Sequence, residues 1–365
     1  MRPPASVGQR LEEVDTPALI LDLDAFERNI QVLRRALPKR IRLRPHAKTH
    51  KSPDIARRQI EAGAVGVCCQ KVSEAEAMVE GGIADVLVSN EVVGAQKVAR
   101  LAELSRRAHA GVCVDDLSNL QAIGRSGAKL DVYVEIDLGM RRCGVAPGEP
   151  AVALAREAAR FPNLRFAGLQ AYHGRAQHVR TVEERHAIIE TAAQHVLHTK
   201  RILEKAGLPC PIVTGAGSGT FMFEVESGAW DEIQPGSYVF MDVDYARNEW
   251  AALLPRFEHA LFVLSTVMSR PAASLAVLDA GLKASSVDSG MPAIWRRDGL
   301  AYTRASDEHG CVDIAAGAAA PALGEKLRLV PGHCDPTVNL YDWYVCVRAG
   351  VVESLWPVAA RGAVA

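Results

Sequence analysis

Residues 18–37 read ALILDLDAFERNIQVLRRAL, an apolar run followed by a helical pattern. The run Ala18–Leu23 has the length and the apolar character of a buried strand. In the segment that follows it, four apolar side chains recur at helical spacing: Phe26, Ile30, Leu33 and Leu37. A strand followed by an amphipathic helix is the building unit of parallel α/β folds.

The same unit repeats along the chain as far as about residue 245. Further apolar runs, separated by helical patterns, are Ile41–Arg44, Ala64–Cys68, Asp85–Val88, Ala110–Val114, Asp131–Ile136, Phe166–Ala171 and Pro211–Val213. Eight such alternations predict an α/β fold closed into a (β/α)8 TIM-like barrel. An open doubly wound sheet is the alternative.

The pattern changes after about residue 250. Apolar runs such as Leu261–Met268 and Trp343–Arg348 are separated by Gly, Pro and Asp instead of helical segments. This texture is typical of a β-rich domain. We therefore expect a barrel domain at residues 19–248 and a second, β-rich domain at residues 249–365.

Composition and charge narrow the class of protein. The formal net charge is −1, so no basic field indicates nucleic acid or an anionic membrane as a partner. Residues 1–10 lack an apolar signal core, and no apolar run is long enough to span a bilayer. The eight cysteines contain no C-x-x-C motif and read as reduced thiols. We expect a cytoplasmic protein.

The first candidate site is the segment RPHAKTHK at residues 44–51, at the end of a predicted strand. If the segment is extended, His46, Lys48 and His50 face the same side. In a barrel this position lies at the active-site mouth. A partly desolvated lysine between imidazoles is expected to have a lowered pKa and to act as a nucleophile. The alternative is a solvated basic turn.

Two glycine-rich segments are candidates for anion binding. TGAGSGT at residues 214–220 follows an apolar strand, and QPGSY occupies residues 234–238. Glycine lets the backbone approach an anion closely, and the hydroxyl groups add hydrogen-bond donors. The first segment lacks the lysine of a Walker loop and the spacing of a dinucleotide fingerprint. Ordinary strand-to-helix turns are the alternative.

A candidate metal site lies in PGHCDPT at residues 331–337. If this segment is extended, His333 and Asp335 share a face while Cys334 points the opposite way. A histidine and a carboxylate suit a divalent ion such as Mn²⁺, Mg²⁺ or Zn²⁺. The alternative is a hydrogen-bonded turn. Arg142, Tyr172 and His178 are further candidates, because each lies at or just beyond a predicted strand end.

Four of these segments together resemble one family. They are DTPA at residues 15–18, RPHAKTH at residues 44–50, QPGSY at residues 234–238 and PGHCD at residues 331–335. They look like the D-threonine aldolase / eukaryotic-type D-serine dehydratase family, whose fold is alanine-racemase-like. In that family a pyridoxal-phosphate barrel precedes a β domain. The resemblance runs in the same order over nearly the whole chain.

The resemblance implies roles for individual residues. Lys48 would hold pyridoxal 5′-phosphate as a Schiff base. Thr214, Gly236 and Ser237 would bind the phosphate, with Tyr245 nearby. The residues implied to line the cofactor ring are Gln70, Arg142 and Tyr172.

The family also implies that residues 1–18 join the β domain and that the active site forms in a homodimer. Alanine racemases place an arginine where this chain has Gln234. That departure weakens a racemase interpretation, because the ring nitrogen would meet a different electrostatic environment.

The metal motif discriminates within the family, since the dehydratase branch resembles H-x-C and the aldolase branch H-x-D. This chain has His333 and Asp335 in the H-x-D pattern. The implied reaction is cleavage of a D-3-hydroxy amino acid to glycine and an aldehyde, with the metal polarising the 3-hydroxyl and His178 accepting its proton. A 3-hydroxy-D-amino-acid dehydratase is the runner-up, and a cofactor carrier without turnover is the non-enzymatic alternative.

Overall fold

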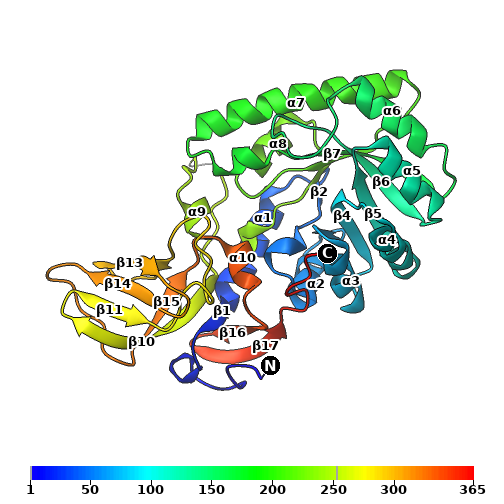
Figure 1. Cartoon of the computed structure of the whole chain (residues 1–365). Coiled ribbons are helices and arrows are strands. Elements are labelled where there is room, and N and C mark those ends of the chain that lie inside the picture. The colour runs from blue at the N-terminus through cyan, green and yellow to red at the C-terminus, as the bar shows by residue number, and fades with distance from the viewer. Residues whose placement is uncertain (1, 252–253) are drawn as a thin grey trace.

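The computed structural model of the chain describes residues 2–251 and 254–365. The elements form two separate sheets, one wrapped by helices and one made of strands that come largely from the last third of the chain (Figure 1). None of the helices in the described residues is long and apolar enough to cross a membrane.

The first sheet has eight parallel strands. They are β2 (Arg42–Leu43), β3 (Val67–Cys69), β4 (Asp85–Glu91), β5 (His109–Val114), β6 (Leu130–Glu135), β7 (Leu164–Ala171), β8 (Ile212–Gly215) and β9 (Glu232–Ile233). Their order is β2-β9-β8-β7-β6-β5-β4-β3. A parallel bridge between His46 and Cys68 joins the two ends, so the sheet closes as the predicted (β/α)8 barrel.

Helices cover the outside of this barrel (Figure 1). They are α1 (Leu23–Ala36), α2 (Pro53–Glu61), α3 (Val72–Glu80), α4 (Ala95–Arg107), α5 (Leu117–Arg125), α6 (Glu149–Ala158), α7 (Val182–Lys205) and α8 (Phe221–Ser227). Side-chain caps fix where several of them begin. Asp22, Asp116 and Thr181 each accept a hydrogen bond from the third residue beyond them, at the starts of α1, α5 and α7.

The second sheet has nine strands. They are β1 (Ala18–Asp22), β10 (Leu261–Ala272), β11 (Leu275–Leu278), β12 (Ala293–Ile294), β13 (Leu300–Ala305), β14 (Gly310–Ile314), β15 (Lys326–Val330), β16 (Trp343–Arg348) and β17 (Val351–Pro357). The expected β-rich texture after residue 250 is therefore confirmed.

The strand β1 corrects one sequence-based prediction. The run Ala18–Leu23 was expected to be the first barrel strand, but β1 pairs antiparallel with β10 and parallel with β16 in the second sheet. A buried apolar run has the same sequence signature in either sheet, so the pattern alone does not choose between them. The N-terminal contribution to the second sheet reaches Asp22. The domain division at residues 248 and 249 stays a prediction.

Two short helices link the sheets near the barrel mouth. They are α9 (Val243–Ala246) and α10 (Cys334–Val338). At the start of α9, the amides of Val243 and Asp244 donate hydrogen bonds to the carbonyl oxygens of Pro331 and Gly332, respectively. These hydrogen bonds hold the start of the predicted metal motif against the end of the barrel.

Candidate active site

A cavity opens at the carboxyl ends of the barrel strands, where barrel active sites form. The residues that line it are His46, Lys48, Thr49, Gln70, Ser89, Arg142, Gln170, Tyr172, Ala216, Gly217, Ser218, Gln234, Gly236, Ser237 and Tyr245. Seven of the predicted site residues lie among them: Lys48, Gln70, Arg142, Tyr172, Gly236, Ser237 and Tyr245. Segments far apart in the sequence thus meet in one pocket.

Lys48 lies in the 3₁₀ helix η2 (Ala47–Thr49), and its ammonium group pairs closely with the carboxylate of Asp335. Burial opposes the charge on Lys48, but the Asp335 carboxylate outweighs burial and raises the pKa of Lys48 above its ordinary value. The lowered pKa expected from the neighbouring imidazoles is therefore wrong. Asp335, which lies 287 residues further along the chain, supplies the negative charge that keeps Lys48 protonated.

The predicted arrangement of the two histidines around Lys48 is correct only for His46. The His46 ring lines the cavity, with Nε2 3.1 Å from Gln70 Oε1. Burial, supported by the positive charge of Lys48, lowers the pKa of His46 to about 3. Because the segment is helical and not extended, His50 turns away and is fully buried. Its Nδ1 accepts a hydrogen bond from the Ser52 amide at 3.1 Å.

Two backbone segments form a cradle on one side of the cavity. Ala216, Gly217 and Ser218 come from the first glycine-rich segment, and Gly236 with Ser237 from the second. The Tyr238 amide donates to Ser218 Oγ at 3.0 Å and so ties the two segments together.

The cradle depends on small residues. A Cβ atom at Gly236 would overlap the hydroxyl of Thr49, and one at Gly217 would overlap the side chain of Gln177. The Thr49 hydroxyl is buried without a hydrogen-bond partner in the described residues. Backbone amides and an unpartnered hydroxyl around a space that only glycine leaves open fit a phosphate group.

Thr214, predicted as a phosphate ligand, does not line this cavity. Its hydroxyl donates to Glu232 Oε1 at 2.9 Å and accepts from Gln234 Nε2 at 2.8 Å. Gln234 in turn donates to Gln170 Oε1 at 2.9 Å. A pair of neutral amides, Gln170 and Gln234, therefore lines this part of the cavity.

On another side of the cavity, the guanidinium carbon of Arg142 lies 5.6 Å from the centroid of the Tyr172 ring. Gln70 approaches His46, as above, and its backbone amide donates to Glu74 Oε2 at 2.5 Å. Tyr245, on α9, lies against His178 with ring centroids 5.7 Å apart. Aromatic and cationic side chains of this kind suit a flat ring that carries polar substituents.

The metal motif has a different backbone from the one predicted. His333 precedes α10 and Asp335 lies within it, so the segment is helical and not extended. The direction expected for Cys334 agrees with its position: it is fully buried, with Sγ 3.6 Å from the carbonyl oxygen of Met241.

His333 and Asp335 have the features of metal ligands. His333 Nδ1 lies 2.8 Å from Asp288 Oδ2, which leaves Nε2 free to bind an ion. Asp335 Oδ1 is buried and has no hydrogen-bond partner in the described residues. Burial alone would raise the pKa of Asp335, but Lys48 and His333 lower it to about 2, so the group is a carboxylate at neutral pH. These observations fit a divalent cation.

His178, the predicted base, lies at the end of η3 (Gly174–His178) and is half exposed. Its Nδ1 is 2.5 Å from Asp244 Oδ2. Arg180 Nη2 donates to the other oxygen of Asp244 at 2.5 Å. A histidine oriented through Nδ1 by a fixed carboxylate presents Nε2 as its proton-accepting atom.

Several of these supporting residues were not predicted from the sequence. Asp244 and Asp288 contact the predicted histidines His178 and His333, and Thr49 lies against Gly236. In each pair the two residues are far apart in the sequence. Carboxylates near glycine-rich or hydroxyl-rich segments are common in protein sequences. Their presence therefore does not identify a residue that orients a catalytic histidine.

Family models match most of the chain. The alanine racemase N-terminal domain matches residues 21–244, and the putative serine dehydratase domain matches residues 260–347. The chain is 50% identical to a D-threonine aldolase of Arthrobacter sp, over 99% of this chain and 96% of that protein. It is 48% identical to a 3-hydroxy-D-aspartate aldolase of Paracoccus denitrificans (strain Pd 1222), over 98% of this chain and 95% of that protein.

A solved structure supports the same grouping. The crystal structure of a D-threonine aldolase from Filomicrobium marinum superposes with a TM-score of 0.97 at 54% identity, over 100% of both chains. A D-threo-3-hydroxyaspartate dehydratase of Delftia sp. (strain HT23) is more distant, at 30% identity over 94% of this chain and 97% of that protein.

Proposed function

Because the chain belongs to the aldolase branch of the family that joins an alanine racemase N-terminal domain to a serine dehydratase domain, we propose that it cleaves D-3-hydroxy amino acids to glycine and an aldehyde. It is a pyridoxal-phosphate lyase that breaks a carbon–carbon bond. Substrates of the D-threonine or 3-hydroxyaspartate type fit the names of its relatives. The observation that carries the proposal is the ion pair between Lys48 and Asp335. It joins the predicted cofactor lysine to a predicted metal ligand within one chain.

We propose that Lys48 carries the cofactor and that the cradle of Ala216–Ser218, Gly236 and Ser237 holds its phosphate. Arg142, Tyr172 and Gln70 would then border the ring. When bound, pyridoxal phosphate supplies an electron sink for the pair left on Cα after the bond breaks. Thr214 contributes indirectly, because its hydroxyl fixes the amide of Gln234 at the wall of the cavity.

We further propose that His333 and Asp335 hold a divalent ion, with Mn²⁺, Mg²⁺ and Zn²⁺ as candidates. Such an ion supplies a Lewis acid that polarises the substrate 3-hydroxyl. Asp288 fixes the imidazole of His333 through Nδ1, and the buried Oδ1 of Asp335 provides the second ligand atom. Their arrangement matches a carboxylate–histidine–metal chain.

His178 is proposed to accept the proton of that 3-hydroxyl at Nε2. Asp244 accepts the hydrogen on Nδ1 and so fixes the tautomer, and Arg180 holds Asp244 in place. Transfer of the proton to a positioned base typically contributes about 10²–10⁴-fold to the rate. With the hydroxyl proton removed, the Cβ–O bond becomes a carbonyl as the Cα–Cβ bond breaks, and the aldehyde leaves. Cα then takes up a proton, which gives glycine.

The dehydratase alternative is weaker, because the dehydratase relative is 30% identical whereas the aldolase relatives are 48% and 50% identical. The H-x-D motif supports the same choice. The alternative of a cofactor-binding protein without catalytic activity lacks support, because relatives named as aldolases match nearly the whole chain. We also propose that the enzyme is a cytoplasmic homodimer.

Product analysis tests this function. The EDTA-treated holoenzyme is incubated with D-threonine and with D-3-hydroxyaspartate, with and without added Mn²⁺. We expect glycine plus acetaldehyde or glyoxylate, formed only when the metal is restored. Ammonia and a 2-oxo acid would instead identify a dehydratase. Absence of cofactor absorbance, with no difference between the wild-type enzyme and Lys48→Ala, would contradict the whole account.

A further inference from the structure

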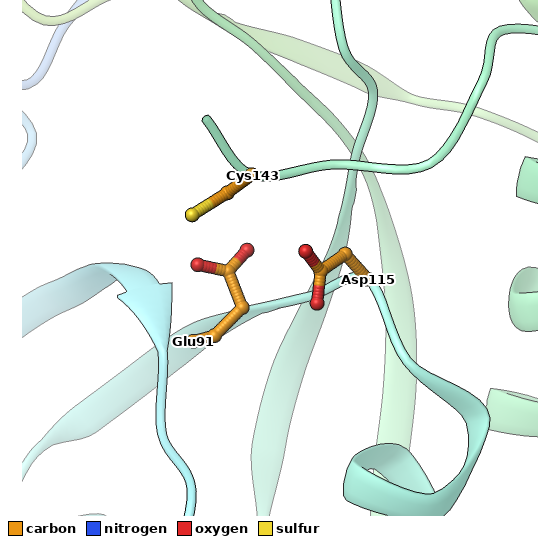
Figure 2. A group of neighbouring side chains, drawn as sticks. All are labelled: Glu91, Asp115 and Cys143. Carbon is orange, nitrogen blue, oxygen red and sulfur yellow. The ribbon is translucent and has the colours of Figure 1, made fainter. Parts of the chain in front are cut away.

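A second group of potential metal ligands lies at the barrel mouth, away from α10. Glu91 ends β4, Asp115 follows β5, and Cys143 lies on the loop after β6. One ligand atom from each of the three lies within 4.8 Å of the others. Figure 2 shows the two carboxylates and the thiol directed toward one another. Three separate strand ends therefore bring their polar groups to a single point.

The carboxylates of this group have few partners. Both oxygens of Glu91 are buried, and in the described residues no group outside this cluster donates a hydrogen bond to them; their polar neighbours are Glu135 and Cys143. Asp115 Oδ2 accepts a hydrogen bond from the Gly144 amide at 2.9 Å. Among residues 2–251 and 254–365, no lysine, arginine or histidine forms an ion pair with Glu91 or Asp115. Unpaired carboxylates out of water are costly unless a cation joins them.

A fourth carboxylate gives an independent indication of a ligand. Glu135, at the end of β6, is 5% exposed and lies against Glu91. In the described part of the chain it forms no ion pair, and the side chain that hydrogen-bonds with it is that of Glu91, a second carboxylate; Arg142 acts on it only through longer-range attraction. A buried carboxylate that faces another one has either a shared proton or a bound cation between them.

We propose that Glu91, Asp115 and Cys143 form a second divalent-metal site, distinct from His333 and Asp335, with the carboxylate of Glu135 beside it. Carboxylate oxygen and thiolate sulfur are ligands that Zn²⁺ accepts, and water can complete a four-coordinate site. A bound dication favours the thiolate form of Cys143, because a coordinated thiol loses its proton.

The site would act on the cofactor pocket through one loop. Cys143 is adjacent in sequence to Arg142, whose guanidinium lines the active-site cavity. The same loop is anchored by Gly144 and Val145, whose amides donate to Asp115 and to the carbonyl oxygen of Glu135. An ion at this point would fix the loop and with it the position of Arg142. Its role is structural, since neither the three ligands nor Glu135 line the active-site cavity.

Metal counting tests the proposal without relying on activity. The holoenzyme is stripped with EDTA, restored with pyridoxal phosphate, incubated with excess Zn²⁺, desalted and analysed by inductively coupled plasma mass spectrometry. We expect two Zn²⁺ ions per wild-type chain and one in Glu91→Gln or Cys143→Ser. Affinity for the lost ion should fall by at least the roughly 10- to 100-fold that loss of a supporting partner costs.

Three controls make the result decisive. Glu149→Gln, which changes an exposed carboxylate on α6, should keep both ions. Asp335→Asn should lose the other ion and keep this one. Reconstitution with Co²⁺ should give a thiolate-to-cobalt absorption band that is absent from Cys143→Ser, a conservative change at a half-buried position.

A wild-type chain that binds a single ion, lost in Asp335→Asn and kept in Glu91→Gln, would overturn the second site. That result would favour a proton shared between Glu91 and Glu135. Two ions retained in both Glu91→Gln and Cys143→Ser would overturn it as well. Neither result affects the aldolase proposal, which product analysis tests separately.

Discussion

Asp335 joins the two halves of the proposed chemistry at the scale of a single residue. One of its oxygens pairs with Lys48, and the other is buried without a partner in the described residues. If Lys48 holds the cofactor, it no longer offers a free ammonium group to Asp335. Asp335 then needs another cation, and a divalent ion next to His333 supplies one. The cofactor and the metal are thus expected to assist each other's binding.

His178 should be required for catalysis but not for cofactor binding. We expect His178→Gln to lower kcat by about 10²–10⁴-fold, because the substrate hydroxyl loses its proton acceptor. Cofactor absorbance should be unchanged, since His178 does not line the cavity. Asp244→Asn should lower kcat in the same direction and change the pH profile, because the tautomer of His178 is no longer fixed. A loss confined to KM would argue against the role of base.

His50 should make stability depend on pH. Burial lowers its pKa to about 3, so the folded chain keeps the ring neutral while the unfolded chain binds a proton below its ordinary pKa. Its contribution to stability is present above pH ~6.5 and is lost as the pH falls toward 3, by up to about 1.4 kcal/mol per pH unit.

Urea unfolding of the wild type and of His50→Gln at several values between pH 4 and pH 7 measures this slope. The slope should be smaller in the variant, while His195→Gln, an exposed change on α7, serves as the matched control. Equal slopes in the wild type and in His50→Gln would show that the buried imidazole is not the group that titrates.

Close approach between strands is the main constraint at the scale of elements. Gly168 in β7 has φ of 144°, and a Cβ atom there would overlap the carbonyl oxygen of Ile212 in β8. We expect Gly168→Ala to destabilise the barrel by more than about 4 kcal/mol or to prevent folding, because two strand backbones would have to separate.

Gly207→Ala is the matched control for this prediction. Gly207 also has positive φ, at 73°, but no atom lies within 4 Å of the position of its Cβ. Its cost should be about 1–3 kcal/mol, that of the backbone conformation alone. Thermal unfolding followed by circular dichroism compares the two variants, and equal losses would mean that interstrand contact is unimportant at Gly168.

The sequence pattern located most of the barrel strands, but it did not show which strands pair with one another. The runs from Ile41–Arg44 to Pro211–Val213 overlap strands β2 to β8 of the barrel, because a buried parallel strand is a continuous apolar segment. Strand β9 is two residues long, too short for any periodicity, and was missed. Strand β1 was found but placed in the wrong sheet, since burial on both faces looks the same in either one.

The active site shows the same difference between local motifs, which were predicted, and long-range contacts, which were not. Lys48, Gly236 and Ser237 were predicted from local motifs and lie together in the cavity. The partners Asp244 and Asp288 were missed, because each meets its histidine through folding of separate loops. The helical turns at η2 and α10 replaced the extended segments that were predicted. In both cases the strand ends before the motif begins. The alternation of side chains in the sequence does not show where a strand ends.

At the scale of the whole molecule, the proposed cofactor lysine and the proposed metal motif meet within a single chain. Lys48 follows β2 and Asp335 lies in α10, yet the two side chains form an ion pair within one protomer. In the proposed homodimer, a mixture of Lys48→Ala and Asp335→Asn chains should therefore remain inactive after refolding together, because every site lacks one group. Aldehyde release measures the outcome, and restored activity would mean that sites are assembled from two chains.

The position of β1 also affects how the protein is synthesised. This strand is synthesised before every barrel strand, but one of its two neighbours, β16, lies at residues 343–348. Every barrel strand is complete by residue 233. The barrel can thus form on the nascent chain while one edge of β1 stays unpaired until residues 343–348 have been synthesised. Such late pairing raises contact order and slows folding, and it makes this short apolar segment the natural place for a chaperone to bind.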